Sequence, residues 1–251
     1  MSPPAPLWHF GDPVAPLAAL LAHGGVLAIP TESSYGLAVP PGSAAGVEAI
    51  YRLKGRERGK PLPVVIAGLD QLAGLGIAPD LPILKLLSAF WPGPLTVVLP
   101  IAGAGAAGAP PAAAGTGTLA IRIPGHPQLI ELLSRLGHGL TATSANRSGG
   151  EPVLDPRQAA ELLAGRPAMV VDGGILPGGP PSTLIAPLDL PAPPAPTPPP
   201  APAGPRDAGS PAGGWCFEVL RPGRLPVEQL RRRLCVMAAD AGTVPGAGRL
   251  C

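Results

Sequence analysis

The sequence is poor in aromatic and charged residues, which make up 3% and 14% of its 251 residues. Its formal net charge of +2 is too small for bulk binding of nucleic acid through counterion release, which requires many cations on one face. The low aromatic content also leaves few platforms on which bases could stack. Any basic site must therefore be local.

Cysteine and histidine patterns typical of metal or disulfide proteins are also missing. The three cysteines, Cys216, Cys235 and Cys251, show neither CxxC spacing nor a paired framework, and the four histidines lack metal-ligand spacing. No apolar run reaches the roughly 18 residues that a membrane span requires, and the first residues show no signal pattern. We therefore expect a cytoplasmic protein that works without a membrane.

Two common nucleotide-binding motifs are absent. The stretch GRERGKP resembles a P-loop, but Gly55 and Gly59 enclose three residues instead of four, and Pro61 follows Lys60 where Ser or Thr is needed. A GxGxxG turn after a strand is not found. No strong Ser-His-Asp or Cys-His signature stands out.

Proline and glycine are abundant, with 39 and 35 residues, and they gather in two segments. The Ala/Gly/Pro stretch at 102–117 predicts a loop, and the proline-rich run at 187–214 predicts a disordered insertion. From the length and composition of the rest of the chain we expect a single domain with an ordered core at about 10–186 and 215–237. A flexible tail is expected at 238–251.

Short apolar runs bounded by Gly and Pro alternate with helical patterns along the chain. Such runs are typical of strands that are buried on both faces. Strands are expected at 26–30, 62–68, 94–100, 118–124, 140–145, 168–174, 182–186 and 216–223. Helices are expected at 12–22, 43–53, 80–90, 126–136 and 155–164. This alternation predicts an α/β fold with a twisted, open, mixed or parallel sheet and flanking helices.

A run of alternating cations, RLKGRERGKP at 52–61, contrasts with the low overall charge. Charge runs are most often solvated loops, and that interpretation stays open. However, the run contains two of the three lysines in a chain with fifteen arginines. This bias hints that a compact ammonium is needed there.

Small polar and cationic residues follow or interrupt several predicted strands. They are Thr31–Ser34, Arg122, Thr141–Asn146, Ser182–Thr183 and Arg221. Ligands of open α/β sheets bind where strand ends and their loops converge. Hydroxyl, amide and guanidinium groups can hold phosphates and carboxylates by positioning and charge alone. The pattern predicts an anion site that works without a side-chain nucleophile.

Seven motifs, in order along nearly all of the chain outside the two low-complexity segments, resemble the YrdC/Sua5 family. They are IPTESSYGLA (29–38), IYRLKGRERGKPLPVVI (50–66), FWPGPLTVVL (90–99), LAIRIPGHP (119–127), TATSANRSGGEP (141–152), DGG with STLI (172–185) and LRPG (220–223). Each motif alone is weak, but their joint order is specific.

The resemblance implies a single-domain YrdC-like fold and L-threonylcarbamoyl-AMP synthase activity, which is a nucleotidyltransferase reaction. Threonine, bicarbonate and ATP would give threonylcarbamoyl-adenylate and diphosphate for the t6A modification of tRNA. ATP would be a substrate with Mg²⁺, and no tightly bound cofactor is implied. The implied partners are a downstream tRNA threonylcarbamoyl transferase complex and weakly bound tRNA.

The resemblance also implies roles for individual residues. Thr31, Arg122 and Ala142 would bind threonine. The ATP site would consist of Lys54, Arg58, Thr118, Ser144, Pro152, Ser182 and Arg221. The catalytic signatures would be Lys54 with Arg56 and Ser144 with Asn146. Local alternatives remain, such as a turn role for Thr31.

Two positions depart from the family pattern, and two other functions remain as alternatives. Pro181 and Ala186 stand where relatives usually carry acidic residues, which puts the ATP lid in question. One alternative is a binding module for double-stranded RNA or tRNA. The other is a carbamoyl-transfer domain of the hydrogenase-maturation type, although no Cys-rich zinc motif is seen.

Overall fold

The computed structural model describes residues 4–102, 108–146, 149–161, 167–188, 217–233 and 249–250. The predicted insertion at 187–214 and the predicted tail at 238–251 lie almost entirely outside these residues.

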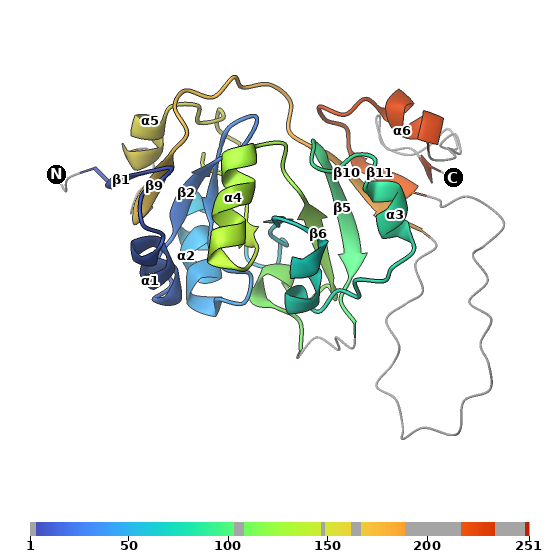
Figure 1. Cartoon of the computed structure of the whole chain (residues 1–251), viewed down its shortest axis with the longest axis horizontal. Coiled ribbons are helices and arrows are strands. Elements are labelled where there is room, and N and C mark those ends of the chain that lie inside the picture. The colour runs from blue at the N-terminus through green and yellow to red at the C-terminus, as the bar shows by residue number, and fades with distance from the viewer. Residues whose placement is uncertain are drawn as a thin grey trace.

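The described strands form two open sheets, and helices flank both (Figure 1). In spatial order, the first sheet contains β1 (Leu7–His9), β9 (Met169–Asp172), β2 (Leu27–Pro30), β3 (Tyr35–Ala38) and β8 (Thr143–Ser144). The second contains β12 (Arg249–Leu250), β11 (Phe217–Arg221), β10 (Thr183–Pro187), β5 (Leu95–Pro100), β6 (Thr118–Arg122), β4 (Val64–Val65) and β7 (Leu140–Thr141). Both sheets mix parallel and antiparallel pairs, which confirms the predicted α/β class, although the strands are divided between two sheets.

The helices are short and lie against the sheets. They are α1 (Ala15–Ala22), α2 (Ala44–Lys54), α3 (Ile83–Leu87), α4 (Pro127–Leu136), α5 (Pro156–Glu161) and α6 (Val227–Arg233), with 3-10 helices η1 (Leu69–Leu75) and η2 (Pro111–Ala113). Figure 1 shows α1, α2 and α5 around the first sheet, and α3 and α6 beside the second.

The first sheet is covered on both faces. Successive side chains of a strand point to opposite faces, so Leu27 and Ile29 pack with α1 and α4, while Ala28 packs with α2 and α5. All four residues of β2 are buried. The continuous apolar run at 26–30 is therefore explained by two hydrophobic contacts, one on each side.

Strand β5 of the second sheet packs against the hydrophobic core with one face only. Leu95, Val97 and Leu99 of β5 belong to the main hydrophobic core, together with residues of α3 and η1. Between them, Thr96 and Val98 point to the opposite face, which lines a cavity. The polar residue in this apolar strand thus marks the side of the sheet that lines the cavity.

One segment joins the two sheets. Residues 140–141 pair with β4 of the second sheet, whereas residues 143–144 pair with β3 of the first. Thr141 makes the link because its N–H donates to the Val39 carbonyl (2.8 Å), and its Oγ1 accepts from the Val39 N–H (3.0 Å). The strand predicted at 140–145 is therefore two short strands in different sheets.

Several element boundaries differ from the sequence-based expectation. The strand predicted at 62–68 shortens to β4, and the helix predicted at 80–90 shortens to α3. Asp12 was expected to open the first helix, but its carboxylate accepts from the His9 N–H (2.8 Å), and α1 begins at Ala15. The prediction also missed β1, α6 and β3, which forms a hairpin with β2 through a four-residue loop (31–34) that lacks an Asn-Gly or Asp-Gly turn signal.

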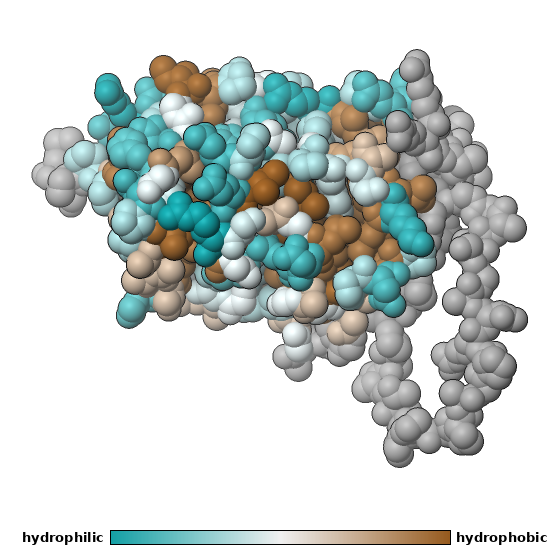
Figure 2. All heavy atoms as spheres, viewed as in Figure 1, coloured by the Kyte–Doolittle hydropathy of each residue, from teal (hydrophilic) through white to brown (hydrophobic). Residues whose placement is uncertain are grey.

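The surface is mixed in character. On the face shown in Figure 2, hydrophobic residues gather near the middle and are bordered by hydrophilic ones. Within the part of the chain that the structure describes, no helix has the length and apolar character needed to span a bilayer.

We expect Thr141→Val to lower the free energy of unfolding by about 1–3 kcal/mol, because the isosteric side chain leaves the buried Val39 N–H without its acceptor. Urea denaturation monitored by circular dichroism measures this change. An unaltered midpoint would contradict the linking role of Thr141.

Candidate active site

A cavity of about 660 Å³ lies where the two sheets meet. The first sheet contributes the β2–β3 loop, the start of β3 and β8, and the second contributes the uncovered faces of β5, β6, β10 and β11. The lining includes these predicted site residues: Thr31, Arg56, Thr118, Arg122, Ala142, Ser144, Asn146, Pro152, Ser182 and Arg221. The fold therefore brings together most of the predicted site from segments far apart in the sequence.

A β-bulge turns Arg221 into the cavity. Leu184 of β10 pairs with Arg221. The next residue, Ile185, pairs with Val219, which leaves Leu220 as the extra residue of β11. Because paired residues share a face of the sheet, Val219 stays in the core while Arg221 lies on the same side as Leu184.

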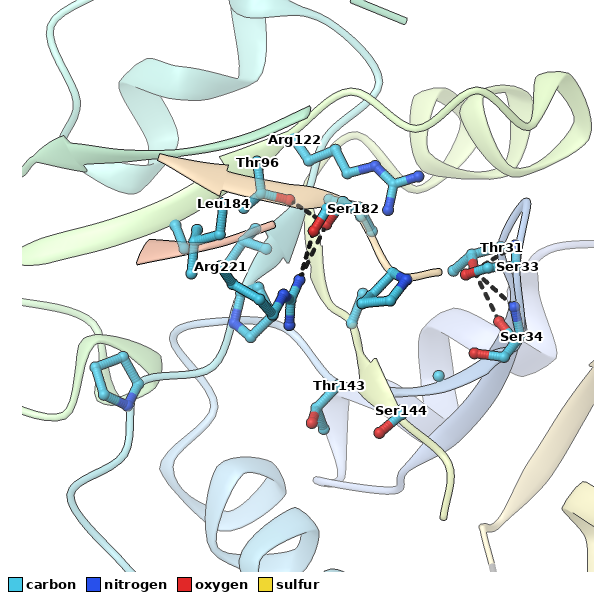
Figure 3. Close-up of a pocket in the computed structure, with 18 of the residues that line it drawn as sticks. Thr31, Ser33, Ser34, Thr96, Arg122, Thr143, Ser144, Ser182, Leu184 and Arg221 are labelled. Atoms are coloured by element: carbon cyan, nitrogen blue, oxygen red, sulfur yellow. Dashed lines mark hydrogen bonds between the residues drawn. The ribbon is translucent and has the colours of Figure 1, made fainter. Parts of the chain in front are cut away.

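Arg221 is held by a small polar network (Figure 3). Its Nη2 donates to the Ser182 carbonyl (2.8 Å) and lies 3.3 Å from Ser182 Oγ, which shares a 2.7 Å hydrogen bond with Thr96 Oγ1. Burial lowers the pKa of Arg221. Gly223 permits the segment after β11 to lie close to the segment before β10, since a Cβ there would lie 2.3 Å from the Pro181 carbonyl oxygen.

Thr31 organises the loop after β2. Its Oγ1 donates to the Ser34 carbonyl (2.7 Å) and accepts from the N–H groups of Ser33 and Ser34 (3.3 Å each). Thr31 is thus a turn residue, and it also lines the cavity. The structure thus confirms the turn interpretation for this residue, while its role in binding threonine stays a prediction.

Arg122 is buried at the end of β6 and has a carboxylate partner. It forms an ion pair with Glu32, and its Nε donates to the Gly93 carbonyl (3.0 Å). Burial, together with the cations Arg221 and Arg224, lowers the pKa of Arg122 to about 10, so it stays charged at neutral pH. In Figure 3 its guanidinium extends toward the loop that carries Thr31.

Lys54 lies behind the cavity wall. It is 4% exposed, and its ammonium donates to the carbonyl oxygens of Ser144 and Asn146, the latter at 2.8 Å. Burial and the nearby Arg56 lower the pKa of Lys54 to about 8. The lysine therefore holds the loop that carries Ser144 and Asn146, and its side chain does not itself line the cavity.

Arg56 and Asn146 each have a buried atom free for a ligand. Arg56 Nη1 donates to Thr143 Oγ1 (3.3 Å), and Nη2 donates to the Pro61 carbonyl (3.2 Å). Among the described residues, Arg56 Nε and Asn146 Oδ1 are buried without a hydrogen-bond partner. Because unpaired buried polar atoms are unfavourable, this donor and this acceptor are available to a polar molecule in the cavity.

The remaining cations of the 52–61 run point to solvent. Arg58 pairs with Glu48 through Nε and Oε2 (3.0 Å), and Lys60 pairs with Glu57 (3.1 Å). The side chain of Arg58 is 77% exposed and is not among the lining residues, and its role in binding ATP stays a prediction. In the run at 52–61, Lys54 and Arg56 therefore point toward the protein interior, whereas Arg58 and Lys60 form a solvated loop.

The cavity is positively charged. Its described lining contains three arginines and eight serines and threonines from the strands and loops, together with further polar groups, but no aspartate or glutamate. The part of the chain that the structure describes also contains no group of three or more His, Cys, Asp or Glu side chains that could hold a metal ion. This arrangement suits a ligand that carries several negative charges.

Sequence reasoning missed three residues of the site. Thr96 could have been found because it is a hydroxyl residue within the otherwise apolar strand at 95–100, and its side chain points to the face opposite that of Leu95 and Val97. Tyr35 lines the cavity, and its hydroxyl donates to the Gly174 carbonyl (2.9 Å); burial raises its pKa to about 12. Glu32 was named only as part of the polar run 31–34, and its pairing with Arg122 was not predicted because the two residues are ninety positions apart in the chain.

The sequence is similar to a known protein family and to individual members of it. The Sua5_yciO_yrdC model, described as "Telomere recombination", matches residues 19–193. A threonylcarbamoyl-AMP synthase of Bacillus subtilis is 42% identical over 165 residues, covering 65% of this chain and 47% of that protein. One of Alkalilimnicola ehrlichii is 38% identical over 164 residues, covering 64% and 81%. The chain thus spans about half the length of the first relative and most of the second.

Solved structures share the fold. Pyrococcus abyssi Sua5 complexed with L-threonine aligns with a TM-score of 0.69 and 27% identity, over 91% of this chain and 60% of that one. Escherichia coli YciO aligns with a TM-score of 0.60 and 23% identity, over 74% of this chain and 90% of that one, which shows a common fold.

We expect the purified protein to bind tripolyphosphate, and Arg221→Gln to weaken that binding roughly tenfold by removing one charge-assisted contact. Isothermal titration calorimetry measures both affinities. Arg157→Gln, at an exposed position of α5, is the matched control and should bind like the wild type. Equal losses in the two variants would show that the effect is one of net charge and not of the cavity.

Proposed function

The chain belongs to the Sua5/YciO/YrdC family, and from this premise we propose that it is a threonylcarbamoyl-AMP synthase. It would join L-threonine, bicarbonate and ATP to give threonylcarbamoyl-adenylate, diphosphate and water. The observation that carries the proposal is the cavity itself, which combines buried arginines with hydroxyls and lacks a carboxylate among its described lining residues.

The threonine end of the cavity would be formed by Thr31, Arg122 and Ala142. Arg122 is suited to a carboxylate, because a guanidinium offers paired donors and this one is buried and charged. Thr31 belongs to a turn whose hydroxyl-bearing residues Thr31, Ser33 and Ser34 line the cavity. The P. abyssi relative in complex with L-threonine supports placing an amino acid in this fold.

The ATP end would use the other cations and the uncovered face of the second sheet. Arg56, Arg221 and Ser144 face the cavity and would contact phosphates, while Lys54 would act from behind the Ser144 loop. Thr118, Pro152, Ser182 and Asn146 would complete the nucleotide site. Arg58 would need to leave Glu48 and turn inward, a movement that an exposed ion pair permits.

The proposed chemistry is an attack by a carbamate on the α-phosphate. The threonine amine captures CO₂ or bicarbonate, and the second route releases water. A carbamate oxygen then attacks the α-phosphorus, and diphosphate leaves as the new P–O bond forms. Alignment and charge stabilisation suffice for this step, which agrees with the absence of a recognisable nucleophile among the lining residues.

Mg²⁺ would accompany ATP. The described lining offers hydroxyl and amide oxygens but no carboxylate, so the residues fit an ion that phosphate oxygens carry into the cavity. Pro181, which lines the cavity, stands where the family resemblance implies an acidic residue. The ion would neutralise part of the phosphate charge.

The product would pass to a tRNA threonylcarbamoyl transferase complex for t6A synthesis, because a carbamate joined to AMP is an activated group that must be transferred. A cytoplasmic location and weak tRNA binding remain part of the proposal. A pure RNA-binding module is disfavoured by the low net charge and aromatic content. The hydrogenase-maturation alternative shares the fold but has no further observation in its favour.

The direct test of the proposed function is diphosphate release from ATP by the purified chain. We expect release only when L-threonine and bicarbonate are both present, with little release when serine replaces threonine. Arg122→Gln should raise KM for threonine at least tenfold, because a charge-assisted contact to the substrate carboxylate is lost. Release that ignores threonine would overturn the proposal.

The pH dependence of ATP use tests the role of Lys54. Because burial lowers its pKa to about 8, the ammonium is present below that pH and is lost above it. We expect kcat/KM for ATP to fall above pH of about 8 in the wild type, relative to Lys54→Arg, whose side chain stays charged. The quantity compared is kcat/KM for ATP of the wild type divided by that of Lys54→Arg. Effects of pH on threonine or bicarbonate are the same for both proteins and cancel in this ratio. A constant ratio from pH 7 to pH 10 would rule out a charged role for Lys54.

A further inference from the structure

Glu32 is the acidic residue that contacts the predicted substrate-binding arginine. It lies in the loop between β2 and β3, next to Thr31, and its side chain is 15% exposed. Its carboxylate pairs with Arg122, and its Oε1 accepts from the Gly125 N–H (3.2 Å) at the start of the segment that leads into α4. The residue therefore connects the β2–β3 loop to the end of β6.

The surroundings of Glu32 are strongly cationic. Arg224, after β11, donates from Nη1 to the Glu32 carbonyl oxygen (2.8 Å), and Arg221 and Arg224 both lie close enough to lower the pKa of Arg122. Like charges that converge in a partly dehydrated site repel one another. Among the described residues, Glu32 is the carboxylate that forms an ion pair with this cluster.

The contacts of Arg122 leave one part of its guanidinium unused. Nε donates to the Gly93 carbonyl, and Nη2 faces Glu32. Within the described residues no partner of Nη1 is found, and Arg122 lines the cavity. Because a guanidinium is planar, fixing two of its three nitrogen atoms also fixes the direction of the third.

We propose that Glu32 is a positioning residue, which holds Arg122 in the one orientation that presents Nη1 to the carboxylate of the amino-acid substrate. This inference rests on the proposed function, in which Arg122 receives threonine. Glu32 would not touch the reacting atoms. Its effect would be on threonine affinity, since an arginine that is fixed in advance loses less entropy when the substrate binds.

A competing role for Glu32 predicts a change of KM for threonine in the opposite direction. If Glu32 competed with the substrate carboxylate for Arg122, its removal would free the guanidinium and lower KM for threonine. If Glu32 positions Arg122, its removal raises that KM. In both roles Glu32 acts through Arg122, which the proposed function assigns to threonine, so KM for threonine should change much more than KM for ATP.

The experiment compares Glu32→Gln with the wild type in the diphosphate-release assay, titrating threonine and ATP in turn. The amide keeps the size of the side chain and removes its charge. We expect KM for threonine to rise roughly tenfold, with KM for ATP and kcat within about twofold of the wild type. Glu131→Gln, on the exposed face of α4, gives the same charge change away from the cavity and should behave like the wild type.

A second variant separates charge from shape. Glu32→Asp keeps the carboxylate on a shorter side chain, so it should recover part of the threonine affinity that Glu32→Gln loses. Thermal unfolding of each variant verifies that the protein is folded; if Glu32→Gln does not fold, Glu32→Asp alone should still raise KM for threonine selectively. An unchanged or lower KM for threonine in folded Glu32→Gln, or in Glu32→Asp if Glu32→Gln does not fold, overturns the inference. Failure of the wild type to release diphosphate with threonine would instead overturn the proposed function.

Discussion

The site depends on keeping several guanidinium groups charged within one partly buried cavity. Arg56, Arg122 and Arg221 all line it, and no carboxylate is found among its described lining residues to offset them. Each arginine is instead held from behind, by Glu32, by backbone carbonyls or by hydroxyls of the sheet. The charge thus remains available to a ligand, and an anion would relieve the repulsion between the arginines.

The backbone supplies the geometry that this charge requires. The segment 140–144 changes sheets at Thr141, so Ser144 faces the strands of the second sheet across the cavity. The bulge at Leu220 turns Arg221 to the same side, and Lys54 fixes the Ser144 loop through its carbonyl oxygens. Catalysis by alignment needs this kind of rigid support, because small displacements of the reacting groups are costly.

Much of this arrangement could be predicted from the sequence, for identifiable reasons. Apolar runs such as 26–30 indicate strands buried on two faces, and their alternation with helical patterns predicts the α/β class. Helix α2 begins after Ser43 and ends before Gly55, close to its expected ends. Hydroxyls and arginines at strand ends marked most of the cavity. The division into two sheets was not predictable, because it depends on the hydrogen bonds of Thr141 to Val39, which lie far apart in the chain.

The same limit explains the cations of the 52–61 run. Their alternation does not reveal that Lys54 points inward from the last turn of α2 while Arg58 pairs with Glu48 on the surface. Glu32 was missed for a similar reason, because a partner in space leaves no periodic signal. Residues that act through tertiary contacts therefore required the structure.

The most direct test of the account follows the carbon of bicarbonate. The purified chain would be incubated with ATP, Mg²⁺, L-threonine and ¹³C-bicarbonate, and the adenylates would be identified by mass spectrometry. The account predicts an adenylate that contains both threonine and the ¹³C label, formed together with diphosphate. Consumption of ATP without a labelled threonine adenylate would contradict the claim that this cavity joins a threonine carbamate to AMP.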